Sequence, residues 1–147
     1  MKNESHALSS GSHACKCARM RHDPKLVVLT GGPGGGKTAL LEMARRYFCQ
    51  HVVILPEAAS IIFGGGFPRL ATPSARRAAQ RAIFHVQRQL ELIALEDRKT
   101  AVVLCDRGTL DGAAYWPGSR QTFCEEFGIV LEKELTQIGR ASCRERV

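Results

Sequence analysis

The chain has 147 residues, of which 44% are hydrophobic and 24% charged, and its formal net charge is +7. This length allows a single domain with a substantial core but not two, and no apolar run is long enough to span a bilayer. Residues 25–137 carry fourteen basic and eleven acidic side chains, a net charge of +3 with no basic block. We therefore expect no membrane contact, and the charge distribution argues against nucleic acid as the main partner.

Residues 1–24 form a polar leader rich in Ser, His, Lys and Arg. They lack an apolar period and the apolar core of a secretory signal, which predicts a disordered leader on a cytoplasmic protein. The six cysteines include no C-x-x-C pair, so reduced thiols are expected. Cys15 and Cys17, with histidines nearby, are a weak candidate for a soft-metal site, and an unstructured tail is the favoured interpretation.

The most specific motif follows an apolar run at residues 25–30 that predicts a short buried strand. It fills the template G-x-x-x-x-G-K-[ST] of a phosphate-binding P-loop, and good helix formers come directly after it. Glycines allow backbone N–H groups to approach an anion closely, and the helix adds its positive end. We expect this loop to bind a nucleoside triphosphate, ATP or GTP, rather than to be a flexible glycine loop with an accidental lysine. The binding residues are Gly31, Gly32, Pro33, Gly34, Gly35, Gly36, Lys37, Thr38 and Ala39.

Two of these side chains have expected roles in chemistry. Lys37 is expected to reach the β- and γ-phosphates, and the Thr38 hydroxyl is expected to ligate the Mg²⁺ that bridges them.

A second apolar run at residues 51–55 predicts the next strand, which makes the first βαβ unit. Glu57 follows at the C-terminal edge of that strand, where open α/β sheets place their ligand crevice. It either serves the crevice or opens the first turn of a short helix, where the helix dipole favours a carboxylate. The glycine cluster at residues 64–69 is either a mobile loop over the crevice or a plain connector.

Thr72 and Pro73 give an N-cap and a first-turn proline for the longest predicted helix. Its apolar stripe is expected at Ala79, Ala82, Ile83, Val86, Leu90 and Ile93. The arginines on its other face are typical of a solvated surface.

The third predicted strand, residues 101–105, ends in Asp106 and Arg107. A carboxylate at this point can hold Mg²⁺ directly or through water, and the guanidinium can bind an anionic or polar substrate group. The alternative is a surface Asp–Arg pair in a simple turn. Trp116 and a tyrosine in the following loop either stack on a planar substrate or close the core, and residues 120–137 are expected to be helical.

The last ten residues, 138–147, show neither helical nor strand periodicity. Their sequence resembles the reading-frame translation of a common short-read sequencing adapter, so we set them apart as a non-native tail. On this interpretation residues 25–137 hold an incomplete domain truncated at its C-terminus. Further strands, lid arginines and base contacts are then expected beyond the cut.

The set of motifs resembles the AAA-type ATPase family typified by the kinase domain of NadR, through T-G-G-P-G-G-G-K-T, P-E-A-A, Q-R-Q-L-E and D-R-G-T-L-D-G-A-A-Y-W. The resemblance runs from about residue 25 to 137. It implies an α/β fold of the P-loop NTPase type, with three αβα layers, a parallel sheet and nucleoside-kinase character. It also implies that Glu57 acts as a base and that Asp106 and Arg107 serve metal and substrate. Hydrolytic AAA+ motors usually carry Asp-Glu at the end of the Walker B strand, where the second carboxylate activates water. Here the second residue is Arg107, which favours kinase chemistry.

The expected function is transfer of a phosphoryl group from ATP to the hydroxyl of a small, nucleoside-like molecule. Lys37, Thr38 and Mg²⁺ neutralise the phosphates, Glu57 accepts the hydroxyl proton, and Asp106 positions the metal. The alternative is a regulatory module that holds ATP or GTP and switches conformation without an organic acceptor.

Overall fold

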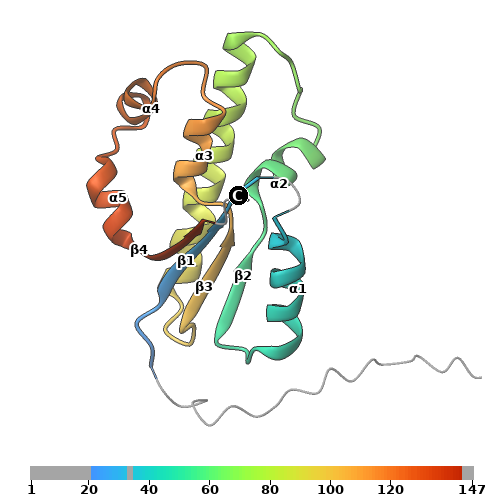
Figure 1. Cartoon of the computed structure of the whole chain (residues 1–147), viewed down its shortest axis with the longest axis vertical. Coiled ribbons are helices and arrows are strands. Elements are labelled where there is room, and N and C mark those ends of the chain that lie inside the picture. The colour runs from blue at the N-terminus through green and yellow to red at the C-terminus, as the bar shows by residue number, and fades with distance from the viewer. Residues whose placement is uncertain (1–20, 33–34, 144–147) are drawn as a thin grey trace, which may run out of the picture.

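A computed structural model describes residues 21–32 and 35–143 of the chain (Figure 1). Its centre is a four-stranded parallel sheet in the order β2-β3-β1-β4. The strands are β1 (Lys25–Thr30), β2 (Val52–Leu55), β3 (Val102–Asp106) and β4 (Ile138–Cys143). The first three match the predicted strands to within a residue at each end, and the expected α/β class is confirmed.

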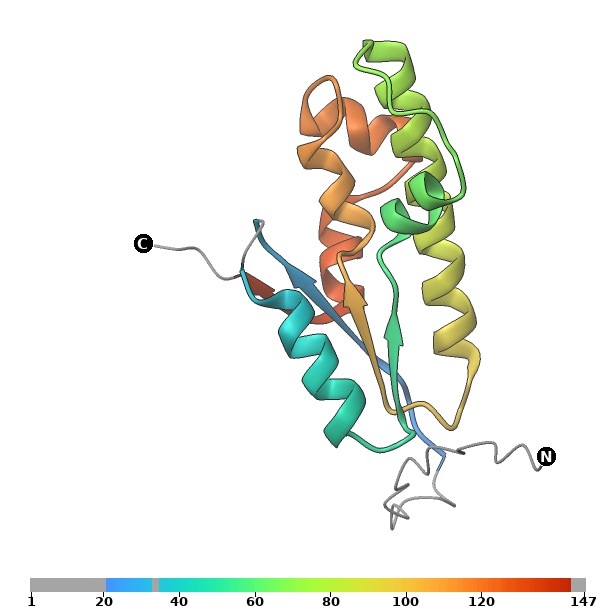
Figure 2. The ribbon, with the colours of Figure 1, turned by 90° about the vertical axis from the view of Figure 1, so that its right-hand side faces the viewer.

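Helices cover both faces of the sheet, which makes three layers. Figure 2 shows α1 (Lys37–Tyr47) on one side and α3 (Pro73–Glu96) on the other. Alternate residues of β3 serve the two sides, because Leu104 packs in the cluster with α1 whereas Val103 and Cys105 pack in the cluster with α3. No helix within the described residues is both long and apolar enough to cross a membrane.

The long helix α3 begins as the sequence predicts. Thr72 is the N-cap, its Oγ1 accepts a hydrogen bond from the Ala75 N–H at 3.3 Å, and Pro73 occupies the first turn. The expected apolar stripe is wrong at Ile93, which is 68% exposed. The buried face is rotated and consists of Ala79, Phe84, Gln87, Glu91 and Ala94. Two of these residues are polar, so apolar periodicity alone misses them.

An aromatic cluster closes the core beyond the end of the sheet that carries the P-loop. It joins α3 to the short 3₁₀ helix η1 (Thr109–Ala114), the loop after it and α4 (Arg120–Phe127). The rings of Phe84 and Phe127 stack with centroids 4.0 Å apart. Trp116 is buried in this cluster, where its Nε1 donates to Thr122 Oγ1 at 3.2 Å. The tryptophan therefore closes the core, and the tyrosine before it lines a pocket described below.

The helical segment expected at residues 120–137 is two helices, α4 and α5 (Leu131–Gln137). Gly128 separates them in the left-handed conformation, with φ of 60°, and its N–H bonds back to carbonyls of the last turn of α4. This arrangement is a common glycine helix end.

Although residues 138–147 show no strand periodicity, Ile138–Cys143 form the strand β4. This strand pairs in parallel with β1, with Leu26 opposite Ile138 and Thr30 opposite Cys143, after one irregularity in the register. A ladder uses backbone N–H and C=O groups, so an open edge of β1 can be paired by a segment without a side-chain period. The adapter origin of this segment stays a prediction. Residues 144–147 and residues 1–20 of the leader, which include Cys15 and Cys17, lie outside the described residues.

Candidate functional site

The P-loop joins the end of β1 to the start of α1 in a conformation that requires glycine. Gly31 and Gly36 have positive φ values of 139° and 75°, which L side chains rarely adopt. Pro33 and Gly34 lie outside the described residues. No side chain caps the first turn of α1 within the described part of the chain, so the N–H groups of Lys37, Thr38 and Ala39 remain available to an anion.

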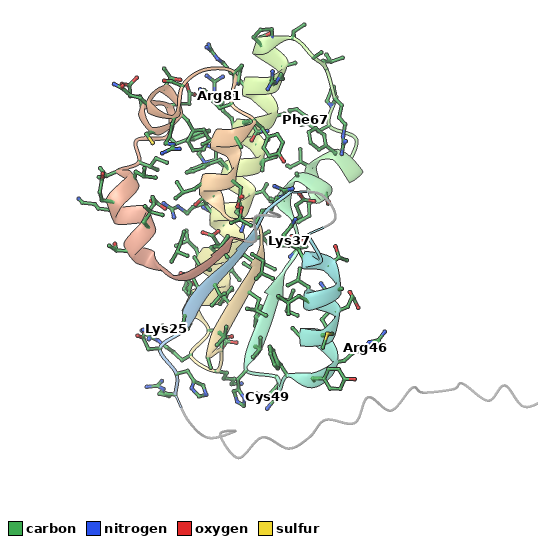
Figure 3. All side chains as sticks on the ribbon, viewed as in Figure 1. Lys25, Lys37, Arg46, Cys49, Phe67 and Arg81 are labelled. Carbon is green, nitrogen blue, oxygen red and sulfur yellow. The ribbon has the colours of Figure 1, made fainter. Side chains whose placement is uncertain are left out.

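Lys37 folds back over the loop from the first turn of α1. Its Nζ donates to the carbonyl oxygens of Gly31 at 2.8 Å and Gly32 at 3.0 Å. Figure 3 shows Lys37 at the end of the sheet opposite Lys25, which is the end where the strands finish. The ammonium therefore stands at the mouth of the loop, where a phosphate can replace the carbonyl oxygens as its partner.

Glu57 and Asp106 lie at the same end of the sheet, after β2 and at the end of β3. Burial raises the pKa of Asp106 above its usual value of 3.8, and the negative charges of Glu57 and Asp111 raise it further. Lys37 and Arg107 oppose this shift. The predicted residues come together because β1, β2 and β3 are parallel and end at one common edge, with Leu55 opposite Cys105 and Leu29 opposite Asp106.

Glu57 and Arg107 form an ion pair within the site. Arg107 Nε donates to Glu57 Oε1 at 2.9 Å, and Ser60 Oγ donates to the other oxygen at 2.7 Å. Glu57 also occupies the N-cap position of α2 (Ala58–Gly64), but its side chain does not cap the helix. Glu57 thus opens the helix through its backbone, while its carboxylate lines a pocket at this edge of the sheet; a role for Glu57 in the crevice stays a prediction.

Arg107 takes an uncommon backbone conformation to make this pair. Its φ is 71°, a left-handed value for a residue other than glycine. Its N–H donates to the Leu29 carbonyl at 3.1 Å, and its guanidinium lies 5.7 Å from the centroid of the Tyr115 ring. The turn after β3 thus sends the side chain into the site instead of onto the surface.

Asp111 is a site residue that the sequence analysis missed. Its Oδ1 accepts a hydrogen bond from Thr30 Oγ1, and its Oδ2 accepts one from the Gly108 N–H at 2.7 Å. The carboxylate thereby joins the last residue of β1 to the turn after β3. Only half of a capping box is present, because Asp111 reaches back to the Gly108 N–H whereas Gly108 has no side chain to cap the helix in return. The sequence therefore carried no clear signal for this contact.

A pocket of about 240 Å³ opens beside the Glu57–Arg107 pair, between α2, α3 and η1. The lining combines aromatic and apolar side chains, two amides and charged groups: Phe63, Ile83, Phe84, Tyr115, Gln80, Gln87, Glu57, Arg69, Arg107 and Asp111. Arg69 lies 4.1 Å above the centre of the Phe63 ring. The loop after α2, which carries Arg69, therefore borders the crevice, and its mobility stays a prediction.

The family of the chain follows from a comparison with protein-family models. Residues 26–139 match the model of an AAA domain, which covers most of the chain and the whole site. The chain belongs to this AAA-domain family. It is therefore a nucleotide-binding P-loop protein, as the motif predicts. No match was found among curated proteins.

Mg²⁺ is the usual partner of nucleotide in P-loop AAA domains. No cluster of three or more His, Cys, Asp or Glu side chains in the described ranges could hold a metal ion by itself. Proteins usually bind Mg²⁺ through one or two side chains plus phosphate oxygens and water. Thr38, exposed on the first turn of α1, and Asp106 supply oxygens of the required kind, and their role as ligands stays a prediction.

Proposed function

We propose that this AAA-domain protein transfers the γ-phosphoryl group of ATP to the hydroxyl of a small, nucleoside-like acceptor. The observation that carries the proposal is the position of the Glu57–Arg107 pair. The pair lines a pocket of about 240 Å³ at the edge of the sheet that carries the P-loop. A carboxylate on the pocket wall can accept the proton of an acceptor hydroxyl, whereas a protein that only holds nucleotide does not need such a group.

In the proposed reaction the acceptor oxygen forms a bond to the γ-phosphorus, and the bond from that phosphorus to the β,γ-bridging oxygen breaks. ADP leaves, and Glu57 takes the hydroxyl proton. Lys37 exchanges its carbonyl partners for phosphate oxygens and balances their charge. Mg²⁺, held through Thr38 and Asp106, supplies further charge neutralisation when bound.

Arg107 serves this scheme by holding the Glu57 carboxylate toward the pocket. The ion pair and the Ser60 hydroxyl occupy both carboxylate oxygens and fix their direction. An acceptor hydroxyl can enter beside the pair, where it donates to Glu57 and receives a hydrogen bond from Arg107. The arrangement supports positioning of the reacting oxygen, which is the main task of a phosphoryl-transfer site.

The alternative is a nucleotide-dependent switch without an acceptor. A switch also needs a P-loop and a metal-binding carboxylate, but it has no use for a mixed aromatic and amide pocket beside them. The pocket lining therefore favours the kinase.

The test measures ADP release with and without a panel of nucleosides and related alcohols. We expect an acceptor to stimulate release, and Glu57→Gln to lower the stimulated rate by about 10²- to 10⁴-fold with nucleotide affinity nearly unchanged. Glu96→Gln, an exposed site on α3, is the matched control and should keep the wild-type rate. If acceptor-stimulated turnover survives in Glu57→Gln, the kinase activity is supported and the role of Glu57 as the base is refuted. Absence of stimulation by every acceptor would favour the switch.

A further inference from the structure

Two polar side chains are buried side by side on the sheet-facing side of α3. Gln87 is 2% exposed and Glu91, one helical turn later, is 3% exposed. Gln87 Nε2 donates to Glu91 Oε1 at 2.8 Å. Burial of an amide and a carboxyl group is unfavourable unless both are hydrogen-bonded. Buried helix positions are usually apolar, so a polar pair at Gln87 and Glu91 calls for an explanation.

The Gln87 amide turns its NH₂ group toward Glu91, because its Nε2 is the donor to Glu91 Oε1. Burial raises the pKa of Glu91 above its usual value, and the negative charge of Glu134 raises it further. The Gln87 hydrogen bond, the positive charge of Arg88 and the Thr109 backbone oppose this shift. An amide whose nitrogen donates to a carboxyl oxygen keeps its own oxygen as an acceptor for another partner.

Gln87 also lines the pocket proposed for the acceptor. With the nitrogen committed to Glu91, the amide offers its oxygen to that pocket as a hydrogen-bond acceptor of fixed direction. Gln80 lines the same pocket two turns earlier, and the rings of Phe63 and Tyr115 belong to its walls. Glu57 and Arg107 belong to the same lining, so one bound molecule has both this pair and the Gln87 amide as polar partners within the pocket.

We propose that Gln87 is a specificity-determining residue, which accepts a hydrogen bond from an amino group on a planar ring of the acceptor. Glu91 is a positioning residue, because it sets the direction of the Gln87 amide without touching the ligand. The proposed function supplies the idea of an acceptor, so this inference rests on it. Binding can nevertheless be measured without turnover.

The experiment compares ligands that differ only in the amino group. Adenosine is paired with purine riboside, which lacks the 6-amino group, and cytidine with its analogue lacking the 4-amino group. Affinities are measured by calorimetry with the nucleotide site saturated by Mg²⁺ and a non-hydrolysable ATP analogue, so that the probes compete only for the second pocket. We expect the amino member of at least one pair to bind about tenfold more tightly, because a buried acceptor is left unpaired by the other member.

Two variants and two matched controls separate recognition from folding. Gln87→Leu and the isosteric Glu91→Gln should bring the affinity ratio close to one, since the second frees the amide to turn over. The affinity for the ligand without the amino group should change little. Gln89→Leu and Glu96→Gln alter exposed residues of the same helix and should keep the ratio.

Equal affinities within both pairs in the wild-type protein, or no binding of any probe, would overturn the inference. So would an unchanged ratio in Glu91→Gln, or a parallel loss of both affinities in the two variants, which is what a purely structural pair predicts. A tenfold preference without acceptor-dependent ADP release would keep this inference and refute the phosphoryl transfer.

Discussion

Phe123 is the residue whose truncation should weaken the fold most, and with it the support of the site. Its side chain is 0% exposed, and its ring centroid lies 4.8 Å from that of Phe127, 5.8 Å from Trp116 and 6.2 Å from Phe84. Phe123→Ala removes the whole ring from contact with these three aromatic side chains. Such truncations cost about 3–5 kcal/mol, a large part of the roughly 5–15 kcal/mol by which a domain is stable.

The same ring supports the pocket. A Cβ placed on Gly112 would lie 3.2 Å from Phe123 Cε2, so the ring is in close contact with η1, which carries Asp111. We therefore expect Phe123→Ala to loosen η1 as well as to lower the free energy of unfolding.

Urea denaturation followed by the fluorescence of Trp116, the only tryptophan, measures this effect. With a denaturant slope of about 1–3 kcal/mol/M, the midpoint should fall by at least about 1 M. Phe48→Ala is the control, because Phe48 is 57% exposed and its truncation should change stability by only about 0.5 kcal/mol. A loss below about 1 kcal/mol for Phe123→Ala would refute the assignment of this cluster as the support of the site.

Further predictions concern nucleotide, metal, packing and the last segment. MgATP or MgGTP should raise the melting temperature, and Lys37→Ala should remove most of that rise; an unchanged rise in the variant would contradict the P-loop assignment. The stabilising contribution of Asp106 is full below pH 3.8 and is lost as pH rises through its raised pKa. Asp106→Asn should therefore raise the melting temperature of the free protein at pH 7 and weaken Mg²⁺-dependent nucleotide binding. A lower melting temperature of the variant would contradict the unfavourable burial of the Asp106 charge. Gly108→Ala should lower the free energy of unfolding by about 1–3 kcal/mol in urea denaturation, since its Cβ would lie 3.0 Å from a buried valine methyl group. The control Gly64→Ala has free space around the new Cβ and should not destabilise the fold. Equal effects of the two substitutions would show that the turn at Gly108 can adjust. Resequencing of the source DNA should give a different continuation in place of residues 138–147, and a genomic read through the same codons would show that they are native.

The edge of the sheet that carries the candidate site was predictable because two sequence patterns are local and strong. The P-loop is a contiguous motif, and carboxylates that follow buried parallel strands must meet at one edge of the sheet. Glu57 and Asp106 could therefore be placed together without a structure. Their partners could not, because the ion pair with Arg107 depends on a left-handed turn that no pattern indicates.

The polar pair of α3 and the strand β4 were missed for different reasons. Gln87 and Glu91 satisfy each other one turn apart, so they can occupy a buried face that apolar periodicity assigns to other residues. The strand β4 is held by backbone pairing with β1, and backbone pairing leaves no trace in the side-chain pattern.

The two hydrogen bonds of Asp111 have a consequence for the order in which ligands act. One carboxylate holds the residue immediately before the P-loop and the turn that borders the acceptor pocket. A nucleotide that shifts the end of β1 can therefore strain or relax the pocket through this side chain, in addition to the Arg107 N–H bond to the Leu29 carbonyl. Thermodynamic linkage is reciprocal, so an acceptor changes nucleotide affinity by the same factor as nucleotide changes acceptor affinity. Asp111→Asn exchanges an acceptor oxygen for a donor, and this coupling factor should move toward one even where each ligand alone still binds.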